Sequence, residues 1–198
     1  MRAKWTDLAL EARAGVQQEG EPLEGGIERT VVVIEDEESA KALGRPMGRY
    51  VTLSCPQTMT IELHTREALS RELANTIRGM LPPRARTVLV TGLGNRSVTP
   101  DALGPRTVER ILVTRHMDGC LPDDVSARMG SVCAAAPGVL GVTGIETAEV
   151  LRGMAQHVRP DAIIAVDALA ARDSRRICST IQVADTGIAP GSGVSAFW

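Results

Sequence analysis

Two aspartates follow apolar segments typical of buried strands, and their carboxylates are suited to acid/base chemistry. Asp101 comes after the β-branched run at residues 87–90, and Asp167 ends the apolar run that begins at Asp161. Because the carboxyl ends of parallel strands meet at one edge of a sheet, we expect both carboxylates to form one site there. Two close carboxylates do not easily both ionise, so they share a proton and can both accept and donate one.

Simpler interpretations of the same residues remain open. An aspartate after a strand is often a helix cap or a turn former. Gly92 and Gly94 permit a tight turn, and the backbone N–H groups of Gly94 and Asn95 are candidates to bind an oxyanion. Residues 92–97 also partly match a dinucleotide-binding fingerprint, with Asp118 as the nearest candidate for ribose, but the third glycine is missing. We therefore expect no nucleotide cofactor.

Three further residues are candidates for binding substrate. His116 follows the segment at residues 113–115 and is expected near the site. Glu146 is a candidate that would serve equally well in the first turn of its helix, where a negative charge is favourable. Arg172 belongs to a short basic stretch that either forms a solvent-exposed surface or attracts an acidic substrate.

The pattern of the chain predicts one α/β fold with a mainly parallel sheet flanked by helices, because strands and helices alternate from about residue 60 onward. We expect strands at residues 30–34, 50–53, 59–63, 87–90, 111–114, 161–167 and 180–184, and helices at 36–43, 65–80 and 146–158. Residues 15–26 are predicted to be a loop or mobile arm, and residues 118–136 a loop region. We see no linker that would divide two domains.

Composition limits the classes of partner. The chain has 198 residues, with 43% hydrophobic residues, 2% aromatic residues and a formal net charge of -2. So few aromatic residues argue against a surface that stacks on bases, and the charge gives no case for nucleic acid or for a membrane surface. The four cysteines lack a C-x-x-C pairing, so we interpret them as reduced, mostly buried thiols of a cytoplasmic protein rather than as a zinc site.

Several short motifs, in the same order along the chain, give it a family resemblance that covers most of residues 86–194. The chain resembles the germination protease of spore-forming bacteria, also called spore protease. The matching segments are TDLALEA at 6–12, VTGLGN at 90–95, VTPDALGP at 98–105, VTRH at 113–116, APGVLG at 136–141, TGIET at 143–147, DALAAR at 167–172, TIQ at 180–182 and DTGIAPGSGV at 185–194.

The resemblance implies an endopeptidase that starts the degradation of small acid-soluble spore proteins during germination. It implies a catalytic pair of aspartates at Asp101 and Asp167, no cofactor, synthesis as a zymogen, a homotetramer, and a place in the cytoplasm of the forespore and spore core. The family's fold is similar to that of hydrogenase maturation proteases. Residues 1–29 would be an N-terminal arm with a short pro-segment at 1–5, processed near Trp5–Thr6.

The resemblance also leaves alternatives. Residues 30–198 would form a single peptidase domain that lacks the family's C-terminal part, because the chain ends soon after Val194. One rival is a nickel-dependent maturation-type protease, in which carboxylates and a histidine would bind the metal. Another rival is an inactive fragment or relative that only binds a partner.

Overall fold

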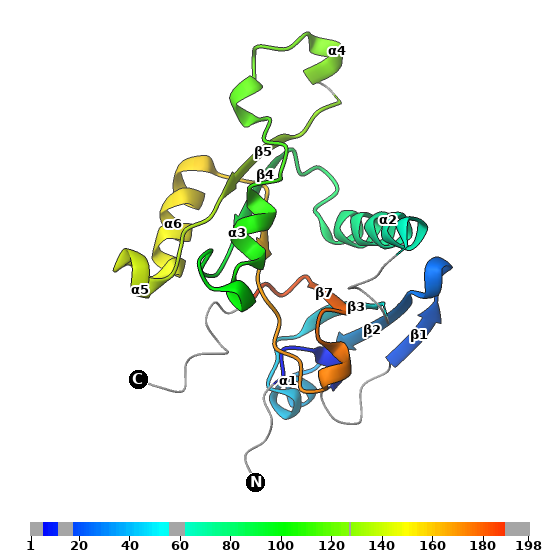
Figure 1. The fold of residues 1–198 in the computed structure, drawn as a ribbon. Coiled ribbons are helices and arrows are strands. Elements are labelled where there is room, and N and C mark those ends of the chain that lie inside the picture. Colours follow the sequence, from blue (N-terminus) through cyan, green and yellow to red (C-terminus); the bar gives the residue numbers. More distant parts are fainter. Residues whose placement is uncertain (1–5, 12–17, 56–61, 127, 189–198) are drawn as a thin grey trace. The chain divides into compact units, whose positions relative to one another are not determined.

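The computed structural model describes residues 6–11, 18–55, 62–126 and 128–188 (Figure 1). They form two compact units. The antiparallel unit comprises the described residues up to Met80 together with residues 169–188, and the parallel unit comprises those of residues 81–168. Within these ranges no helix is long and apolar enough to span a membrane. The prediction of an N-terminal arm and a single peptidase domain stays a prediction.

The antiparallel unit is built on a four-stranded sheet with the strand order β1-β2-β3-β7, in which every pair is antiparallel. Its elements are η1 (Ala9–Glu11), β1 (Gln18–Pro22), η2 (Glu24–Gly26), β2 (Glu28–Ile34), α1 (Glu37–Leu43), β3 (Gly48–Ser54), α2 (Leu63–Met80), η6 (Ser174–Arg176) and β7 (Thr180–Ala184). The strands predicted at 30–34, 50–53 and 180–184 are confirmed as β2, β3 and β7.

Alternation along the central strands directs side chains to two apolar layers. Val32, Ile34 and Tyr50 pack with Ala9 of the N-terminal segment in one cluster, which α1 also contacts. Val51 and Leu53 point to the other face of the same sheet and are 3% and 1% exposed. Apolar side chains are therefore buried on both faces of the central strands, whereas Val33, on the same face as Val51, is 41% exposed.

Local signals position α1 as predicted. The Asp36 carboxylate accepts a hydrogen bond from the Ser39 backbone N–H at 2.7 Å, and Gly44 ends the helix with a left-handed φ of 63°. The helix predicted from Thr65 begins two residues earlier, at Leu63, so Thr65 lies inside its first turn rather than at its cap. The strand predicted at 59–63 is wrong at its end, because Leu63 is helical, and residues 59–61 lie outside the described residues.

The segment predicted as a loop or mobile arm is partly a strand. Residues 18–22 form β1, which pairs with β2, and residues 24–26 form η2. The prediction failed because this edge strand has no apolar alternation. An ion pair anchors it instead, since Arg29 of β2 lies 2.6 Å from Glu21 of β1 and 3.1 Å from Glu72 of α2.

The parallel unit contains a three-stranded parallel sheet in the order β5-β4-β6. Its elements are β4 (Thr87–Gly92), η4 (Thr99–Asp101), α3 (Leu103–Val108), η5 (Arg115–Met117), α4 (Asp123–Ser126), β5 (Ser131–Ala135), α5 (Leu140–Thr143), α6 (Thr147–Val158) and β6 (Ala162–Val166). The two crossovers run in opposite directions across β4, and α3 packs against all three strands of the sheet. The predicted α/β class, with a parallel sheet flanked by helices, is confirmed.

Two predictions for this unit were wrong. Residues 111–114 form no strand, because Thr114 turns back to bond residues 130 and 132 at the start of β5. Residues 118–136, predicted as a loop, contain α4 and the third parallel strand, β5. The run SVCAA at 131–135 consists of small residues, and it takes its strand structure from pairing with β4 rather than from an apolar pattern of its own.

Candidate active site

Both predicted catalytic aspartates lie at the carboxyl edge of the parallel sheet. β6 ends at Val166, whose carbonyl oxygen accepts a hydrogen bond from the Leu93 backbone N–H at 2.8 Å, and Asp167 follows at once. Asp101 packs against Gly94, the residue after Leu93, where an added Cβ would lie 2.8 Å from Asp101 Oδ1. Asp101 and the backbone of Val166, the residue before Asp167, therefore contact the same short segment, Leu93–Gly94, just beyond the ends of β4 and β6.

Backbone groups orient both carboxylates. Asp101 Oδ2 accepts a hydrogen bond from the Asn95 backbone N–H at 2.6 Å, and Asp167 Oδ1 accepts one from the Ala168 backbone N–H at 2.8 Å. Asp101 does not cap α3, because the cap position is Ala102 and carries no side-chain cap bond. It does, however, hold the turn between residues 95 and 101, which is a structural role.

Close packing of glycines fixes the position of this turn. A Cβ at Gly104 would lie 2.3 Å from the Leu93 carbonyl oxygen and 2.5 Å from that of Val166, and one at Gly92 would lie 2.2 Å from the Gly104 carbonyl oxygen. The first turn of α3 thus touches the backbone of both strands. Only glycine at positions 92 and 104 permits this approach, which places Asp101 at the end of β4.

The loop that carries Asp101 is also held from outside. Arg96 forms two hydrogen bonds to the Glu109 carboxylate beyond the end of α3, and the Asn95 side-chain oxygen accepts a bond from the Ser97 backbone N–H at 2.9 Å. The hydrogen bond from Arg96 lowers the pKa of Glu109. These contacts restrain a loop whose residues 96–100 are exposed.

The other predicted site residues fall in different places. The Asn95 N–H proposed for an oxyanion is already bonded to Asp101. Glu146 is exposed at the start of α6, on the side of the sheet where β5 ends. His116 is exposed in η5, two residues after Thr114, which bonds the start of β5. The structure therefore places His116 toward the amino edge and does not bring it to the aspartates.

Arg172 belongs to the antiparallel unit, where its side chain donates to the backbone oxygen of Glu11. Asp118, the candidate for ribose binding, accepts a hydrogen bond from the Ser131 hydroxyl at 2.7 Å, at the start of β5. The close approach of Gly104 to Leu93 was not predicted from the sequence, nor was the burial of Glu11, an acidic residue in the segment TDLALEA at 6–12.

Neither a metal cluster nor a disulfide is apparent in the described parts of the chain. No group of three or more His, Cys, Asp and Glu side chains there has a geometry that could hold a metal ion. All four thiols are free; Cys55 is buried and Cys133 half-buried, whereas Cys120 and Cys178 are exposed. The expectation of mostly buried thiols was therefore wrong.

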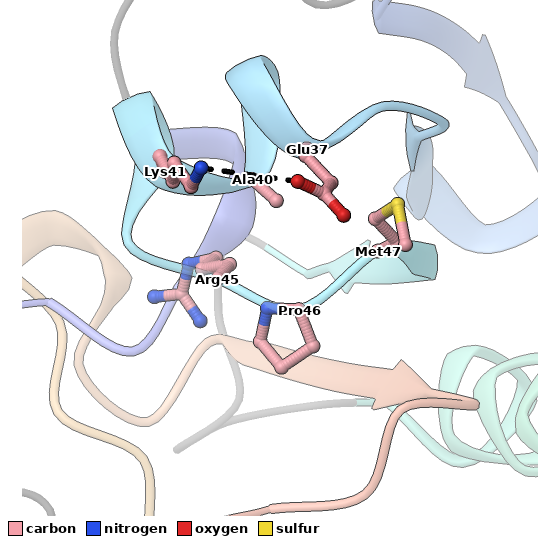
Figure 2. A pocket seen from close by; sticks show the side chains of 6 residues that line it. All are labelled: Glu37, Ala40, Lys41, Arg45, Pro46 and Met47. Atoms are coloured by element: carbon pink, nitrogen blue, oxygen red, sulfur yellow. Dashed lines mark ion pairs between the residues drawn. The ribbon is translucent and has the colours of Figure 1, made fainter.

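An open hollow of about 520 Å³ lies beside α1 in the antiparallel unit. Figure 2 shows its lining, with Lys41 and Glu37 joined by an ion pair of 3.8 Å and Arg45 beside Pro46. None of the predicted site residues is among the residues that line it.

Comparison with known proteins decides the family. A model of the germination protease family matches residues 4–197, which is nearly the whole chain. The chain belongs to the germination protease family. Germination proteases of Caldanaerobacter subterraneus subsp. tengcongensis, Clostridium perfringens and Priestia megaterium are 46%, 42% and 42% identical to it, and each alignment covers 96% of the chain. It spans 61%, 62% and 56% of these three relatives.

Proposed function

We propose that this chain carries the catalytic pair of a germination protease and that Asp101 and Asp167 hydrolyse peptide bonds. The observation that supports this most strongly is that both aspartates follow the carboxyl ends of parallel strands, Asp101 against Gly94 and Asp167 directly after Val166, whose backbone contacts Leu93. Hydrolysis of an amide needs an activated water and a proton donor. Two carboxylates that share one proton meet both needs, because the ionised one takes a proton from water while the other donates to the carbonyl oxygen.

The proposed substrates are the small acid-soluble spore proteins, degraded at the start of germination. The family resemblance supports this choice, and it also supports a homotetramer in the cytoplasm of the forespore and spore core. Gly94 and Glu146 are proposed to contact the substrate backbone from the carboxyl side of the sheet. His116 and Arg172 remain weaker candidates, because His116 lies toward the amino edge of the sheet and Arg172 belongs to the antiparallel unit.

The decisive experiment is to incubate the purified protein with a small acid-soluble spore protein and to map the products by mass spectrometry. We expect defined internal cleavages that persist in a chelator and disappear in Asp101→Asn. Asp124→Asn is the matched control, since Asp124 is an exposed residue of the same unit that pairs with Arg128 at 3.3 Å. Loss of cleavage in chelator with recovery in Ni²⁺ would favour the nickel-dependent alternative, and no cleavage under any condition would favour an inactive relative.

Zymogen processing is proposed at Trp5–Thr6, ahead of the segment that matches the start of the mature family chain. N-terminal sequencing of protein held under mildly acidic, dehydrating conditions tests this. A new N-terminus at Thr6 is the expected result, whereas an unchanged start at Met1 or Arg2 contradicts it.

A further inference from the structure

The two edge strands of the parallel sheet differ in what lies against their outer sides. On β5, the Val132 backbone N–H donates to Thr114 Oγ1 at 2.9 Å, and the Val132 carbonyl oxygen accepts from the Thr114 backbone N–H at 2.9 Å. Thr114 therefore occupies part of that edge. Among the strands that the structure describes, β6 pairs with β4 alone. The outer side of β6 thus has no described strand against it.

The register of β6 identifies the backbone groups on its outer side. Val166 pairs with Gly92, and its carbonyl oxygen accepts from the Leu93 backbone N–H at 2.8 Å, so residue 166 directs its backbone groups toward β4. Because the backbone groups of successive residues in a strand point to opposite sides, Ile163 and Ala165 direct their N–H and carbonyl groups away from β4. A row of such groups is a template for pairing with another chain.

This outer edge of β6 leads directly to a candidate catalytic carboxylate. Asp167 follows β6 at once, and Ala165 lies two residues, or about 7 Å of extended chain, before it. A peptide that adds to a sheet edge gains affinity from main-chain hydrogen bonds. We propose that Ile163 and Ala165 bind an extended segment of the protein substrate as an additional strand, which leads the scissile bond to Asp167. This proposal rests on the proposed function.

The Ile163 side chain offers an apolar contact to the added strand. It lies opposite Leu89 in the register, yet 48% of its surface is exposed at the edge of the sheet. Side chains that lie opposite each other on neighbouring strands interact, so a substrate residue beside Ile163 would cover this surface. The geometry therefore predicts a preference for an apolar substrate residue about four positions from the cleaved bond, since Ile163 lies four residues before Asp167.

The test measures amide hydrogen exchange by NMR in Asp101→Asn, with and without an intact small acid-soluble spore protein at a saturating concentration. The asparagine removes the acid/base group but keeps an oxygen that can accept from the Asn95 backbone N–H. We expect the amides of Ile163 and Ala165 to exchange at least about tenfold more slowly in the complex. The control is Ala134, which faces outward on β5 two residues after Val132, and its amide should not change.

Steady-state kinetics on the same substrate give a second readout. Ile163→Lys places a charge on the edge, a device by which natural edge strands resist pairing. It should raise KM at least about tenfold with kcat nearly unchanged, because the lost contacts bind the ground state and the transition state alike. Leu112→Lys is the matched control, since Leu112 is 79% exposed in the same unit, and it should change neither constant.

The outcomes separate strand addition from the proposed function. Unchanged exchange at Ile163 and Ala165, or slower exchange at Ala134 in their place, would overturn the proposal even if the wild-type chain cleaves the spore protein. If the wild-type chain cleaves nothing while Ile163 and Ala165 are protected, the proposed function fails and strand addition stands. Should Asp101→Asn fail to fold, Asp167→Asn takes its place, with the same results expected.

Discussion

Gly104→Ala tests most sharply whether close backbone packing places Asp101 at the sheet edge. The added methyl would lie 2.3 Å and 2.5 Å from the Leu93 carbonyl oxygen and amide nitrogen, whereas ordinary contacts begin at 3.4 Å. The first turn of α3 would therefore have to withdraw by about 1 Å. The blocking atoms are backbone, so no side-chain rotation relieves the contact, and a gap of that size forfeits a quarter to a half of the local dispersion attraction.

The expected loss of unfolding free energy follows from two opposing terms. Overpacking typically costs about 1–3 kcal/mol, and we take the upper end because backbone atoms are involved. Alanine is favoured over glycine inside a helix by about 1 kcal/mol, which offsets part of this cost. We therefore expect a net loss of about 2 kcal/mol, together with a large loss of peptidase activity as Asp101 moves.

The assay is urea unfolding followed by circular dichroism, combined with hydrogen exchange at the amides of β4. Gly153→Ala is the matched control, because Gly153 lies in α6 of the same unit and an added Cβ there would meet nothing within 4 Å. That variant should gain up to about 1 kcal/mol. If Gly104→Ala proves as stable as Gly153→Ala, the account of how α3 positions Asp101 is refuted.

Two further predictions concern single side chains of the antiparallel unit. Thr52 is 0% exposed, and its hydroxyl has no hydrogen-bond partner among the described residues. Thr52→Val should therefore raise the unfolding free energy by about 1 kcal/mol in thermal unfolding, and a lower melting temperature would contradict this. Hydrogen bonds from Arg175 lower the pKa of Asp173 from its ordinary 3.8 to about 2. The ion pair should therefore contribute to folding stability above pH 4, and this contribution should be lost as the pH falls toward 2. A carboxyl titration by NMR in Arg175→Met should return the pKa of Asp173 toward its ordinary value, and an unchanged titration would show that Arg175 is not the cause.

Sequence patterns predicted those parts of the fold whose signals are local. The run at residues 87–90 is apolar and β-branched, and it forms β4. Asp36 and Gly44 bound α1 because a side-chain cap and a left-handed glycine act within one turn. The sequence contains two apolar runs, and an aspartate comes after each. Because the carboxyl ends of parallel strands meet at one edge of a sheet, this pattern predicted that Asp101 and Asp167 lie at the same edge.

Features that depend on distant partners could not be predicted in this way. β5 is a strand because it pairs with β4, and β1 is a polar edge strand anchored by Arg29. Gly104 and Leu93 pack closely together, but their separation in the sequence matches neither the helical nor the strand repeat, so no sequence pattern indicates the contact. His116 was expected near the aspartates because of its neighbours in the sequence, but the chain turns back at Thr114 toward the start of β5.

The central claim is that Asp101 and Asp167 act as one catalytic unit. The most direct measurement is kcat/KM on a spore-protein substrate for Asp101→Asn, Asp167→Asn and the double variant, with Asp124→Asn as control. Residues that act together are strongly non-additive, so each single variant should lose about 10²–10⁴-fold and the double variant should be little worse than either. A single variant that keeps near-normal activity, or a double variant whose loss equals the product of the two single losses, would contradict the account.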